Sequence, residues 1–423
     1  QFTLNWTSMT VIIDKEAPVS GVIRPLDSGG GVNGRYKPGE IGKIINTTYL
    51  KGTATDWPSV NYAGVDNVRL RLSYLLAGDT YYWTGAAFSS WTVTENTAWQ
   101  DIVPSGGPLT KDWDYVQDIG WYTGGDMEYK LEMRSMDDSR LSNGTGDGNW
   151  ETAPYVTKKF IVDGTVPTVL ITTPTDLARL NYMPVISGTA GADLAGLSVV
   201  SIKVSSYSAG SWLVVSDNNQ ADNIWGSSWS WTGLSGLINQ TTYQIVAKDQ
   251  DKAGNWSPVY STTTFVYDTT KPSVGIIAPV NSRYYGVNAA ESAYYLSQLN
   301  GTSSDAYGIN KTEIQLYEVA TSSYWHTTGW VVNQSSWQYV GQDAWQFSPV
   351  PPLVNGRQYR IEARSYDIAG NLAVYATNYF YYDSTVPAVL LGNPNTAGFL
   401  KNLAQITGTA SDVGSGMLNA QTA

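Results

Sequence analysis

One short phrase with fixed spacing recurs four times in this chain and divides it into repeats. In each copy an aspartate is followed four residues later by a proline, and a second proline comes seven residues after the first. The copies begin at Asp14, Asp163, Asp268 and Asp383. Repetition at this length is typical of a linear array of similar domains. We therefore expect tandem modules, each with a hydrophobic core of its own.

The phrase also sets the expected domain boundaries along the 423 residues. Residues 14–162 are expected to form a first module with insertions, 163–267 a second and 268–382 a third. Residues 1–13 are expected to be the last strand of a preceding module, and 383–423 the incomplete start of a fourth. The partial modules allow two interpretations. Either the chain is a segment of a longer protein, or the end of one copy is completed by a strand of another.

Composition excludes several functional classes. Charged residues make up only 14% of the chain, whereas an average soluble protein has about 25%. The formal net charge of −11 argues against binding to nucleic acid, which requires a basic surface. Because there is no cysteine, neither disulfides nor thiolate metal sites can form. No apolar run reaches the ~18 residues of a membrane span, so any export signal or anchor is expected outside this segment.

Each module shows the same order of sequence signals. After the proline pair an apolar strand ends in Gly-Thr, as at Gly188-Thr189 and Gly301-Thr302, and an aspartate follows within four residues. Next comes an alternating strand such as Ile314-Gln315-Leu316, whose period of two indicates one buried and one solvated face. An Asp-x-Ala-Gly-Asn turn then precedes a last aromatic strand. Short strands, frequent turns and no helical periodicity predict an all-β fold of two-sheet sandwiches.

A further motif makes this pattern more specific. Leu237-x5-Tyr243 and Leu353-x5-Tyr359 resemble the tyrosine corner of immunoglobulin-like domains, in which a tyrosine hydroxyl ties a loop to the sandwich. With the other signals, this makes the modules similar to the bacterial immunoglobulin-like tandem repeats of giant cell-surface and adhesin proteins. The resemblance covers nearly all of residues 14–383. It implies tandem immunoglobulin-like (fibronectin III-like) β-sandwiches arranged as an elongated rod, located extracellularly or at the cell surface.

Acidic residues are expected to converge at one pole of each sandwich. The phrase aspartate precedes the first strand, a second aspartate follows Gly-Thr, and a third begins the Asp-x-Ala-Gly-Asn turn. In an immunoglobulin-like sandwich these three segments share a pole. Carboxylates that lie this close together repel one another unless a cation neutralises them. Ligand sets made only of oxygen atoms suit Ca²⁺. The resemblance implies the same, since related repeats hold calcium at such junctions. The alternative is that each aspartate only stabilises its own turn.

The predicted calcium ligands form sets that repeat along the chain. One set is Asp163, Asp193, Asp251 and Asn255, and the next is Asp268, Asp305, Asp367 and Asn371. The first module lacks the Asp-x-Ala-Gly-Asn turn and offers Asp14 and Asp56, with Asp137 or Asp138 as poor substitutes for a third acid. Asp383 and Asp412 begin a fourth set.

Aromatic residues give a second possible site. Tryptophan and tyrosine rings stack on sugars where one side of the ring is exposed. The candidates for glycan binding are Trp83, Trp229, Trp231, Trp325 and Trp330. These residues fall in predicted strands, where aromatic rings usually pack between sheets or pair across strands. The packing interpretation is therefore preferred to the glycan interpretation.

Sequons and catalytic signals add little. Asn-x-Ser/Thr sequons occur at Asn5, Asn46, Asn143, Asn239, Asn255, Asn300, Asn310 and Asn333. A chain rich in Asn, Ser and Thr produces many of these by chance, so they are weak predictions of glycosylation. His326 is the only histidine, and no conventional nucleophile–base pattern or phosphate-binding loop is present. We therefore expect no enzyme activity.

The most consistent interpretation is a mechanical one. The chain is expected to be a structural or adhesive stalk segment of an exported surface protein or extracellular filament. Its partner would be another copy of itself, through head-to-tail or lateral assembly, or a host or neighbouring surface. The alternative is a glycan-binding module array that uses the Trp and Tyr clusters.

Overall fold

The computed structural model describes residues 11–29, 34–57, 60–140, 145–191, 194–287, 294–395 and 399–415. Over these residues the chain consists of strands, turns and loops without a helix, so nothing there forms a membrane-spanning helix. The expectation of an all-β fold is confirmed. Residues 1–10 of the strand expected over 1–13, Asp193 and the sequons at Asn5 and Asn143 lie outside the described residues, and residues 11–13 are not in a strand.

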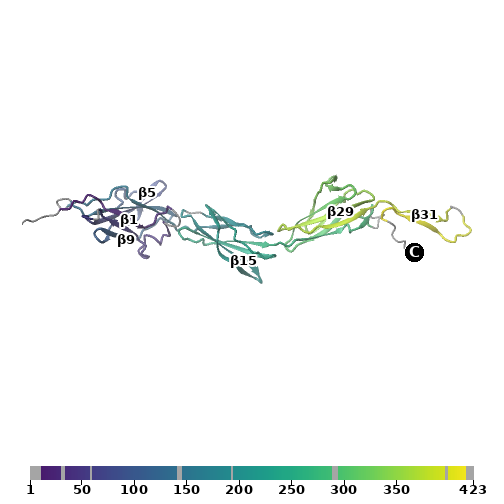
Figure 1. Cartoon of the computed structure of the whole chain (residues 1–423), viewed down its shortest axis with the longest axis horizontal. Helices are drawn as coiled ribbons and strands as arrows, with labels where there is room; N and C mark the ends of the chain where they lie inside the picture. Colours follow the sequence, from purple (N-terminus) through teal and green to yellow (C-terminus); the bar gives the residue numbers. More distant parts are fainter. Residues whose placement is uncertain are drawn as a thin grey trace, which may run out of the picture. The chain divides into compact units, whose positions relative to one another are not determined.

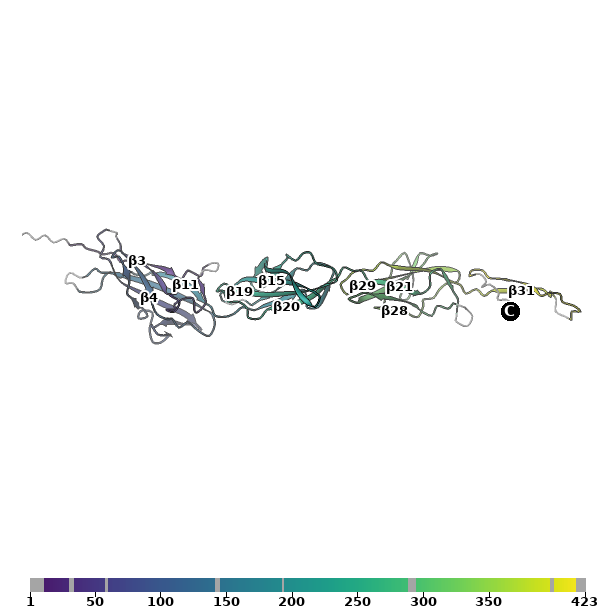
Figure 2. The same ribbon diagram turned by 90° about the horizontal axis from the view of Figure 1, so that it is seen from below.

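Internal contacts divide the chain into two compact units. Figures 1 and 2 show the strands of the chain in two views, coloured along the sequence. The first comprises residues 1–175, 185–234 and 244–263, and the second comprises residues 176–184, 235–243 and 264–423. The module boundaries and the rod-like arrangement expected from the sequence stay predictions.

The first sandwich contains strands β1 to β11. One sheet has the order β1-β3-β9-β8, and the other has the order β2-β11-β10-β4-β5-β6 with β7 also paired to β4. The strands of the first sheet are β1 (Val19–Arg24), β3 (Leu50–Thr55), β8 (Ser105–Gly106) and β9 (Thr110–Tyr115). Those of the second are β2 (Arg35–Tyr36), β4 (Val65–Leu76), β5 (Asp79–Trp83), β6 (Phe88–Ser89), β7 (Gln100–Ile102), β10 (Met127–Asp137) and β11 (Val156–Val162).

The second sandwich contains strands β12 to β20. Its sheets have the orders β12-β14-β18-β17 and β13-β20-β19-β15-β16. The strands of the first sheet are β12 (Val169–Thr173), β14 (Ile186–Ala190), β17 (Asn223–Trp225) and β18 (Ser228–Trp231). Those of the second are β13 (Ala178–Leu180), β15 (Leu197–Ser208), β16 (Ser211–Gln220), β19 (Thr241–Asp251) and β20 (Ser261–Tyr267).

The third sandwich contains strands β21 to β30 and has the orders β21-β23-β28 and β22-β30-β29-β24-β25-β26, with β27 also paired to β24. The strands of the first sheet are β21 (Ser273–Ala278), β23 (Leu299–Ser304) and β28 (Ala344–Phe347). Those of the second are β22 (Arg283–Tyr285), β24 (Ile309–Glu318), β25 (Ser323–His326), β26 (Gly329–Val332), β27 (Gln338–Gly341), β29 (Arg357–Asp367) and β30 (Ala376–Tyr382). A further antiparallel pair, β31 (Ala388–Asn393) and β32 (Thr407–Ser411), follows.

The strand orders are those of an immunoglobulin-like sandwich. In the third sandwich β21, β23 and β28 correspond to strands A, B and E, and β24, β29 and β30 to strands C, F and G of the facing sheet. The chain changes sheet after the second proline of the phrase: β21 pairs antiparallel with β23, whereas β22 pairs parallel with β30. The same change occurs in the first and second sandwiches. The chain is therefore an array of tandem immunoglobulin-like β-sandwiches.

Alternation along the strands places the core between the two sheets. On β29 every second residue is buried, and Tyr359, Ile361 and Ala363 join the core of the third sandwich. The ring of Tyr359 stacks on Phe380 of β30, with centroids 5.5 Å apart. Its hydroxyl accepts a hydrogen bond of 2.7 Å from the amide of Val354, as the hydroxyl of Tyr243 does from Ile238. The predicted tyrosine corner is confirmed.

A glycine–tryptophan pair explains the Gly-Thr signal. Gly301 on β23 lies opposite Trp345 on β28, and a Cβ atom at this position would be 2.0 Å from the carbonyl oxygen of Gly275 and 2.2 Å from the indole ring. Only glycine permits this close approach of backbone and ring. The same pairing joins Gly52 to Trp113 and Gly188 to Trp229.

Candidate cation-binding sites

Three aspartates meet at one end of the third sandwich, as the sequence predicts. Asp268 follows β20, Asp305 follows β23, and Asp367 is the last residue of β29. Each offers a carboxylate oxygen, and these oxygens lie within 4.8 Å of one another. Asp268 and Asp367 are fully buried, while Asp305 is half-buried. Three negative groups are thus gathered in a space that water reaches poorly.

Backbone turns hold these carboxylates in place. Oδ1 of Asp268 accepts a hydrogen bond from the amide of Thr270 at 3.0 Å, and Oδ1 of Asp305 accepts one from Tyr307 at 2.8 Å. Oδ1 of Asp367 accepts from the amide of Asn371 at 2.8 Å. The alternative role expected from the sequence, in which each aspartate stabilises its own turn, is therefore also present. These bonds occupy one oxygen of each carboxylate.

Asn371 acts differently from its predicted role. Its side-chain amide donates to Oδ2 of Asp367 and to the main-chain oxygen of Asp268, both at 2.8 Å. Its side-chain oxygen accepts a bond of 3.3 Å from Asn181. The side chain therefore presents its nitrogen to the acids and positions them, whereas the sequence suggested that its oxygen would bind the metal. Asn255 does the same for Asp251 and Asp163, at 2.9 and 3.2 Å.

One buried oxygen in this cluster has no partner among the described residues. Oδ2 of Asp268 is buried and accepts no hydrogen bond from any described residue. Burial raises the pKa of Asp268, and the charges of Asp305 and Asp367 raise it further. Within the described part of the chain, no Lys or Arg forms an ion pair with these three acids. An oxygen-only cluster with surplus negative charge fits a hard divalent cation such as Ca²⁺.

The first sandwich contains the same arrangement, which corrects the sequence-based expectation. Asp14, Asp56 and Asp137 bring their oxygens within 4.8 Å of one another. Asp137 at the end of β10 takes the place of Asp367, whereas Asp138 forms an ion pair with Arg140 instead. Burial raises the pKa of Asp56, and the charges of Asp14 and Asp137 add to this. Asp137 is therefore the third acid of this set, and the expectation that it would substitute poorly is corrected.

Asn149 completes this first set and was missed by the sequence analysis. Its side-chain amide donates to Oδ2 of Asp137 at 2.7 Å and to the main-chain oxygen of Asp14 at 3.2 Å. An insertion separates it from Asp137, which hides the Asp-x-Ala-Gly-Asn spacing. A signal was nevertheless present, because Gly148-Asn149-Trp150 repeats Gly254-Asn255-Trp256. The tryptophan forms an isolated bridge to the F strand in both copies.

The other two predicted sets are less complete in the described residues. Asp251 binds the backbone and side-chain amides of Asn255, and Asp163 accepts a bond from the amide of Thr165 at 2.8 Å. A further acid, Asp126, was not predicted. Burial opposes its ionisation, but a hydrogen bond shared with the Asp163 carboxyl and bonds donated by Thr165 and Leu194 lower its pKa.

In the fourth set, Asp383 is held by two backbone amides. Oδ1 of Asp383 accepts a hydrogen bond from Thr385 at 2.9 Å, and Oδ2 accepts one from Ser415 at 2.8 Å. Burial opposes ionisation of this carboxyl, but these bonds lower its pKa. Oδ1 of Asp412 is buried and accepts no bond from a described residue.

The tryptophans proposed for glycan binding belong to the interior. Trp83, Trp229 and Trp231 are buried, so no sugar can stack on them, and this part of the glycan prediction is wrong. Trp325 and Trp330 are half-buried and face each other across β25 and β26, with ring centroids 5.6 Å apart. Both pack against the core of the third sandwich. The packing interpretation is the one that the structure supports.

The described sequons have different surroundings. Asn46, Asn239, Asn310 and Asn333 are exposed, and Asn300 is half-buried in β23. The side-chain nitrogen of Asn255, to which a glycan would be attached, donates to Asp251 and Asp163. Glycosylation of Asn255 is therefore incompatible with this arrangement. Asn239 binds the connector instead, through Thr269 and Thr270.

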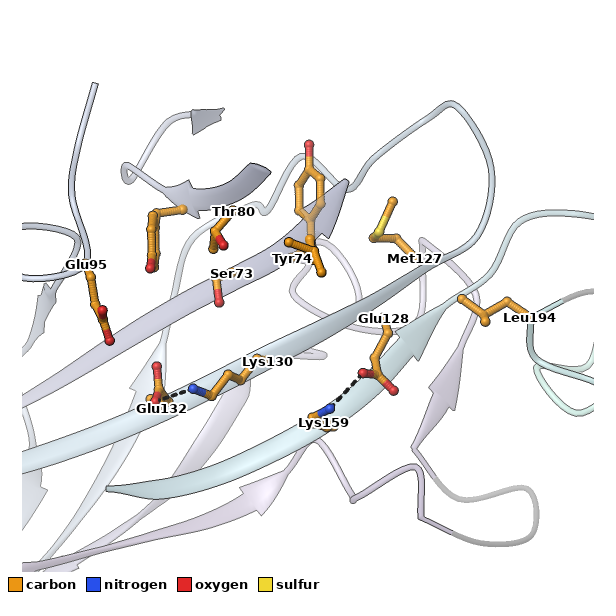
Figure 3. A pocket seen from close by; sticks show the side chains of 12 residues that line it. Ser73, Tyr74, Thr80, Glu95, Met127, Glu128, Lys130, Glu132, Lys159 and Leu194 are labelled. Atoms are coloured by element: carbon orange, nitrogen blue, oxygen red, sulfur yellow. Dashed lines mark hydrogen bonds and ion pairs between the residues drawn. The ribbon is translucent and has the colours of Figure 1, made fainter. Parts of the chain in front are cut away.

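An open groove of about 490 Å³ lies on the first sandwich (Figure 3). Four of its charged side chains form two ion pairs: Lys130 with Glu132 at 2.6 Å, and Lys159 with Glu128 at 3.1 Å. The fifth, Glu95, forms an ion pair of 3.3 Å with Arg71 outside the groove. Because these charges neutralise each other, the groove offers little unbalanced charge for a ligand. His326 lies elsewhere, and its Nε2 is 3.0 Å from the carbonyl oxygen of Gln334.

Comparison with known proteins gives a likeness of fold. No protein-family profile matches the chain, and no curated protein matches it. Among solved structures, it is similar to the fibronectin(III)-like modules of Clostridium thermocellum CbhA, with 16% identity, 51% of this chain and 95% of that chain covered, and a TM-score of 0.29. It is also similar to a tetra-tandem repeat in the extending region of a large adhesion protein, with 18% identity, coverage of 83% and 75%, and a TM-score of 0.26. Domains A168–A170 of titin are 12% identical to the chain; the match covers 86% of this chain and 99% of that one, with a TM-score of 0.29.

Proposed function

We propose that this chain is a structural stalk segment of an exported surface protein or extracellular filament, whose domain connectors are fixed by bound Ca²⁺. Among the described residues of the tandem sandwiches, we find no group of side chains arranged for catalysis. Their clustered acidic residues include the aspartates of the connectors between sandwiches. Asp268 is the residue through which the chain leaves β20 and enters β21. A cation bound there would tie this connector to the loops after β23 and β29.

The buried Oδ2 of Asp268, which has no hydrogen bond from a described residue, is the observation that carries this proposal. A turn-forming aspartate needs only its Oδ1, so a turn function alone leaves the second oxygen without a reason to be buried among like charges. Asp268, Asp305 and Asp367 would hold the cation, and Asn371 would orient two of them. In the first sandwich Asp14, Asp56 and Asp137 would do the same, with Asn149 in the orienting position.

Calorimetry tests this proposal directly. Extracellular calcium modules bind with Kd of roughly 10⁻⁴–10⁻³ M, so about 10 mM Ca²⁺ should stabilise each occupied site by about 1.4–2.7 kcal/mol. We expect thermal unfolding at a higher temperature in Ca²⁺ than in EDTA, and titration calorimetry should show binding. Asp305→Asn should remove the effect of its own site, while Asp79→Asn, at an exposed position, should not. Identical unfolding in Ca²⁺ and EDTA would refute the calcium assignment.

The mechanical part of the proposal needs a separate measurement. If bound cations fix the connectors, small-angle X-ray scattering of the whole chain should report a narrower range of conformations in Ca²⁺ than in EDTA. Scattering that is the same in both solutions, in a protein that binds Ca²⁺ by calorimetry, would leave the ion with a purely local role. The stalk function would then lose its support.

A further inference from the structure

The β15–β16 hairpin of the second sandwich ends its sheet with an unusually long strand. β16 is the last strand in the order β13-β20-β19-β15-β16 and is 10 residues long. A two-residue turn joins it to β15, with φ of 49° at Ala209 and 84° at Gly210. Positive φ at both turn residues suits a type I′ hairpin, whose twist matches that of the paired strands. The ladder is regular from Ser208–Ser211 to Ser205–Val214, and its register shifts beyond these pairs, at Val204 and again before Ile202. β16 is the last strand of its sheet, so the outer side of its regular part, residues 211–214, is a free edge among the described strands.

The part of this edge next to the turn is apolar and uncharged, whereas Asp217 follows farther along β16. Trp212, Leu213, Val214 and Val215 are consecutive and have exposed fractions of 39%, 54%, 55% and 48%. Side chains on both faces of the strand are therefore in contact with solvent. Residues 211–216 include no charged side chain. An exposed, long, apolar edge strand is a template for pairing with another strand.

The corresponding edges of the other two sandwiches are protected. The first sandwich ends in β6, which has 2 residues, and the third ends in β26, which has 4. Trp83 on β5 is buried in its core, and Trp330 on β26 packs on Tyr359 with centroids 5.4 Å apart. Short edge strands are a usual protection against pairing. The 10-residue β16 of the second sandwich lacks this feature.

Hairpin geometry shows which backbone groups point outward. Ser208 and Ser211 close the two-residue turn, and such a closing pair exchanges backbone hydrogen bonds. Bonded and non-bonded pairs alternate along an antiparallel ladder. Trp212 and Val214, which are paired with Tyr207 and Ser205, are therefore in non-bonded pairs. Their N–H and C=O groups point away from β15, toward the free edge.

We propose that β16 pairs with β16 of a second copy of this chain, antiparallel and across a two-fold axis. The outward-pointing N–H and C=O groups of one copy must bond to those of the other. Trp212 of each copy would therefore lie opposite Val214 of the other. Leu213 would then face the same residue of the second copy on the axis. Aromatic–β-branched pairs are favourable across strands. A chain with a net charge of −11 can approach its own copy at this uncharged segment without strong local repulsion.

Cysteine cross-linking tests the predicted register. The chain contains no cysteine, so Leu213→Cys introduces a single thiol. Leu213 would occupy a non-bonded pair with Cα atoms about 4.5 Å apart, which lies within the range of a disulfide. We expect Leu213→Cys to form a covalent dimer under mild oxidation. Val103→Cys, at a more exposed position, should not cross-link at the same rate. Equal rates for the two variants would overturn the proposal.

Sedimentation of the whole chain tests the pairing itself. Val214→Pro removes one outward N–H without touching the ladder to β15, and proline is tolerated at edge positions of this kind. We expect a dimer for the unmodified chain and for Val214→Thr, which keeps the amide, and loss of the dimer for Val214→Pro. Leu213→Lys places two like charges on the axis and should also abolish the dimer, even if the proline variant folds poorly. A monomer at all concentrations, or a dimer insensitive to Leu213→Lys, would contradict the proposal.

Discussion

The side-chain amide of Asn149 donates a hydrogen bond of 3.2 Å to the main-chain oxygen of Asp14, which lies 135 residues earlier in the chain. Its backbone and side-chain nitrogens also hold both oxygens of Asp137. Asn371 makes the same bonds to Asp268 and Asp367. One asparagine in each sandwich thus fixes a carboxylate and the first residue of the connector at the same time.

Removing this asparagine should weaken the hold on both the carboxylate and the connector. Hydrogen bonds to a charged carboxylate contribute about 1.5–3 kcal/mol, so Asn149→Ala and Asn371→Ala should each lower the free energy of unfolding by about that amount. Urea denaturation of the variants measures it. Asn46→Ala is the control, because Asn46 is exposed and its side chain makes one bond, to Gly39. If Asn149→Ala costs no more than Asn46→Ala, the asparagine does not have this structural role.

The carboxylate set of the third sandwich could be predicted from sequence because its spacing is undisturbed. The fold class and the position of strands fixed which loops share a pole, and Asp268, Asp305 and Asp367 follow from that alone. Asn149 could not be found by spacing, since an insertion lengthens the loop between it and Asp137. The relation between them is set by the isolated bridge from Met136 to Trp150, which is a tertiary contact.

Burial of individual tryptophans was harder to predict. An alternating strand shows that two faces differ, and it does not show which face carries the core. Trp229 belongs to a tryptophan cluster that suggests glycan binding, although it packs over Gly188 of the neighbouring strand. The pairing of a glycine on strand B with a tryptophan on strand E involves residues that are far apart in the sequence. It becomes visible only once the register of the two strands is known.

The charge of Asp268 should have opposite effects with and without calcium. In EDTA, Asp268→Asn removes one of three carboxylates that repel one another, so we expect it to raise the free energy of unfolding at pH 7. In Ca²⁺ the same substitution removes a ligand of the ion and should lower the free energy of unfolding. Denaturation curves in the two solutions measure both effects. An effect of the same sign in both solutions would show that Asp268 does not bind the ion.

The gain from Asp268→Asn in EDTA should also depend on pH. Burial and the neighbouring acids raise the pKa of Asp268 in the folded protein. A group with a raised pKa favours the native state below its unfolded pKa of about 3.9, and this contribution is lost as the pH rises through the folded pKa. The advantage of the asparagine should therefore be full above the folded pKa and vanish as the pH falls to the unfolded pKa. Denaturation of both proteins over this pH range tests the sign.

The close approach of Gly301 to Trp345 predicts a severe effect of a single methyl group. Gly301→Ala would place Cβ 2.0 Å from the carbonyl oxygen of Gly275, so the strands must separate. Overpacking of this kind costs about 1–3 kcal/mol or more. Gly329→Ala is the matched control, because a Cβ there meets nothing within 4 Å. Thermal unfolding should distinguish the two variants, and equal stability would show that the ring moves freely.

The tyrosine corner offers a test of one hydrogen bond. Tyr359→Phe keeps the buried ring and removes only the hydroxyl that accepts the amide of Val354. Loss of a partly buried hydrogen bond should cost about 1–2 kcal/mol. Tyr339→Phe, at a position 65% exposed, should change stability little. A cost for Tyr339→Phe as large as that for Tyr359→Phe would argue against the corner as the cause.

A buried carboxyl in the second sandwich is a candidate for stabilisation. Asp249 on β19 is fully buried, and neither of its side-chain oxygens accepts a hydrogen bond from a described residue. Ser135 on β10 and Ser365 on β29 stand at the equivalent place, two residues before the aspartate that ends the strand. Their hydroxyls bond Ser20 at 3.1 Å and Ser303 at 2.6 Å. The second sandwich therefore has an acid where the others have a satisfied hydroxyl.

Asp249→Ser should stabilise the protein at neutral pH. Burial raises the pKa of Asp249, and the charge of Asp251 adds to this. The charged form is therefore unfavourable in the folded state, and its removal should raise the free energy of unfolding by about 1–3 kcal/mol. Below the unfolded pKa of about 3.9 the carboxyl is neutral in both states, so the gain should disappear there. Urea denaturation at pH 7 and at acidic pH measures the difference. A loss of stability at pH 7 would mean that the carboxylate has a partner that compensates its burial.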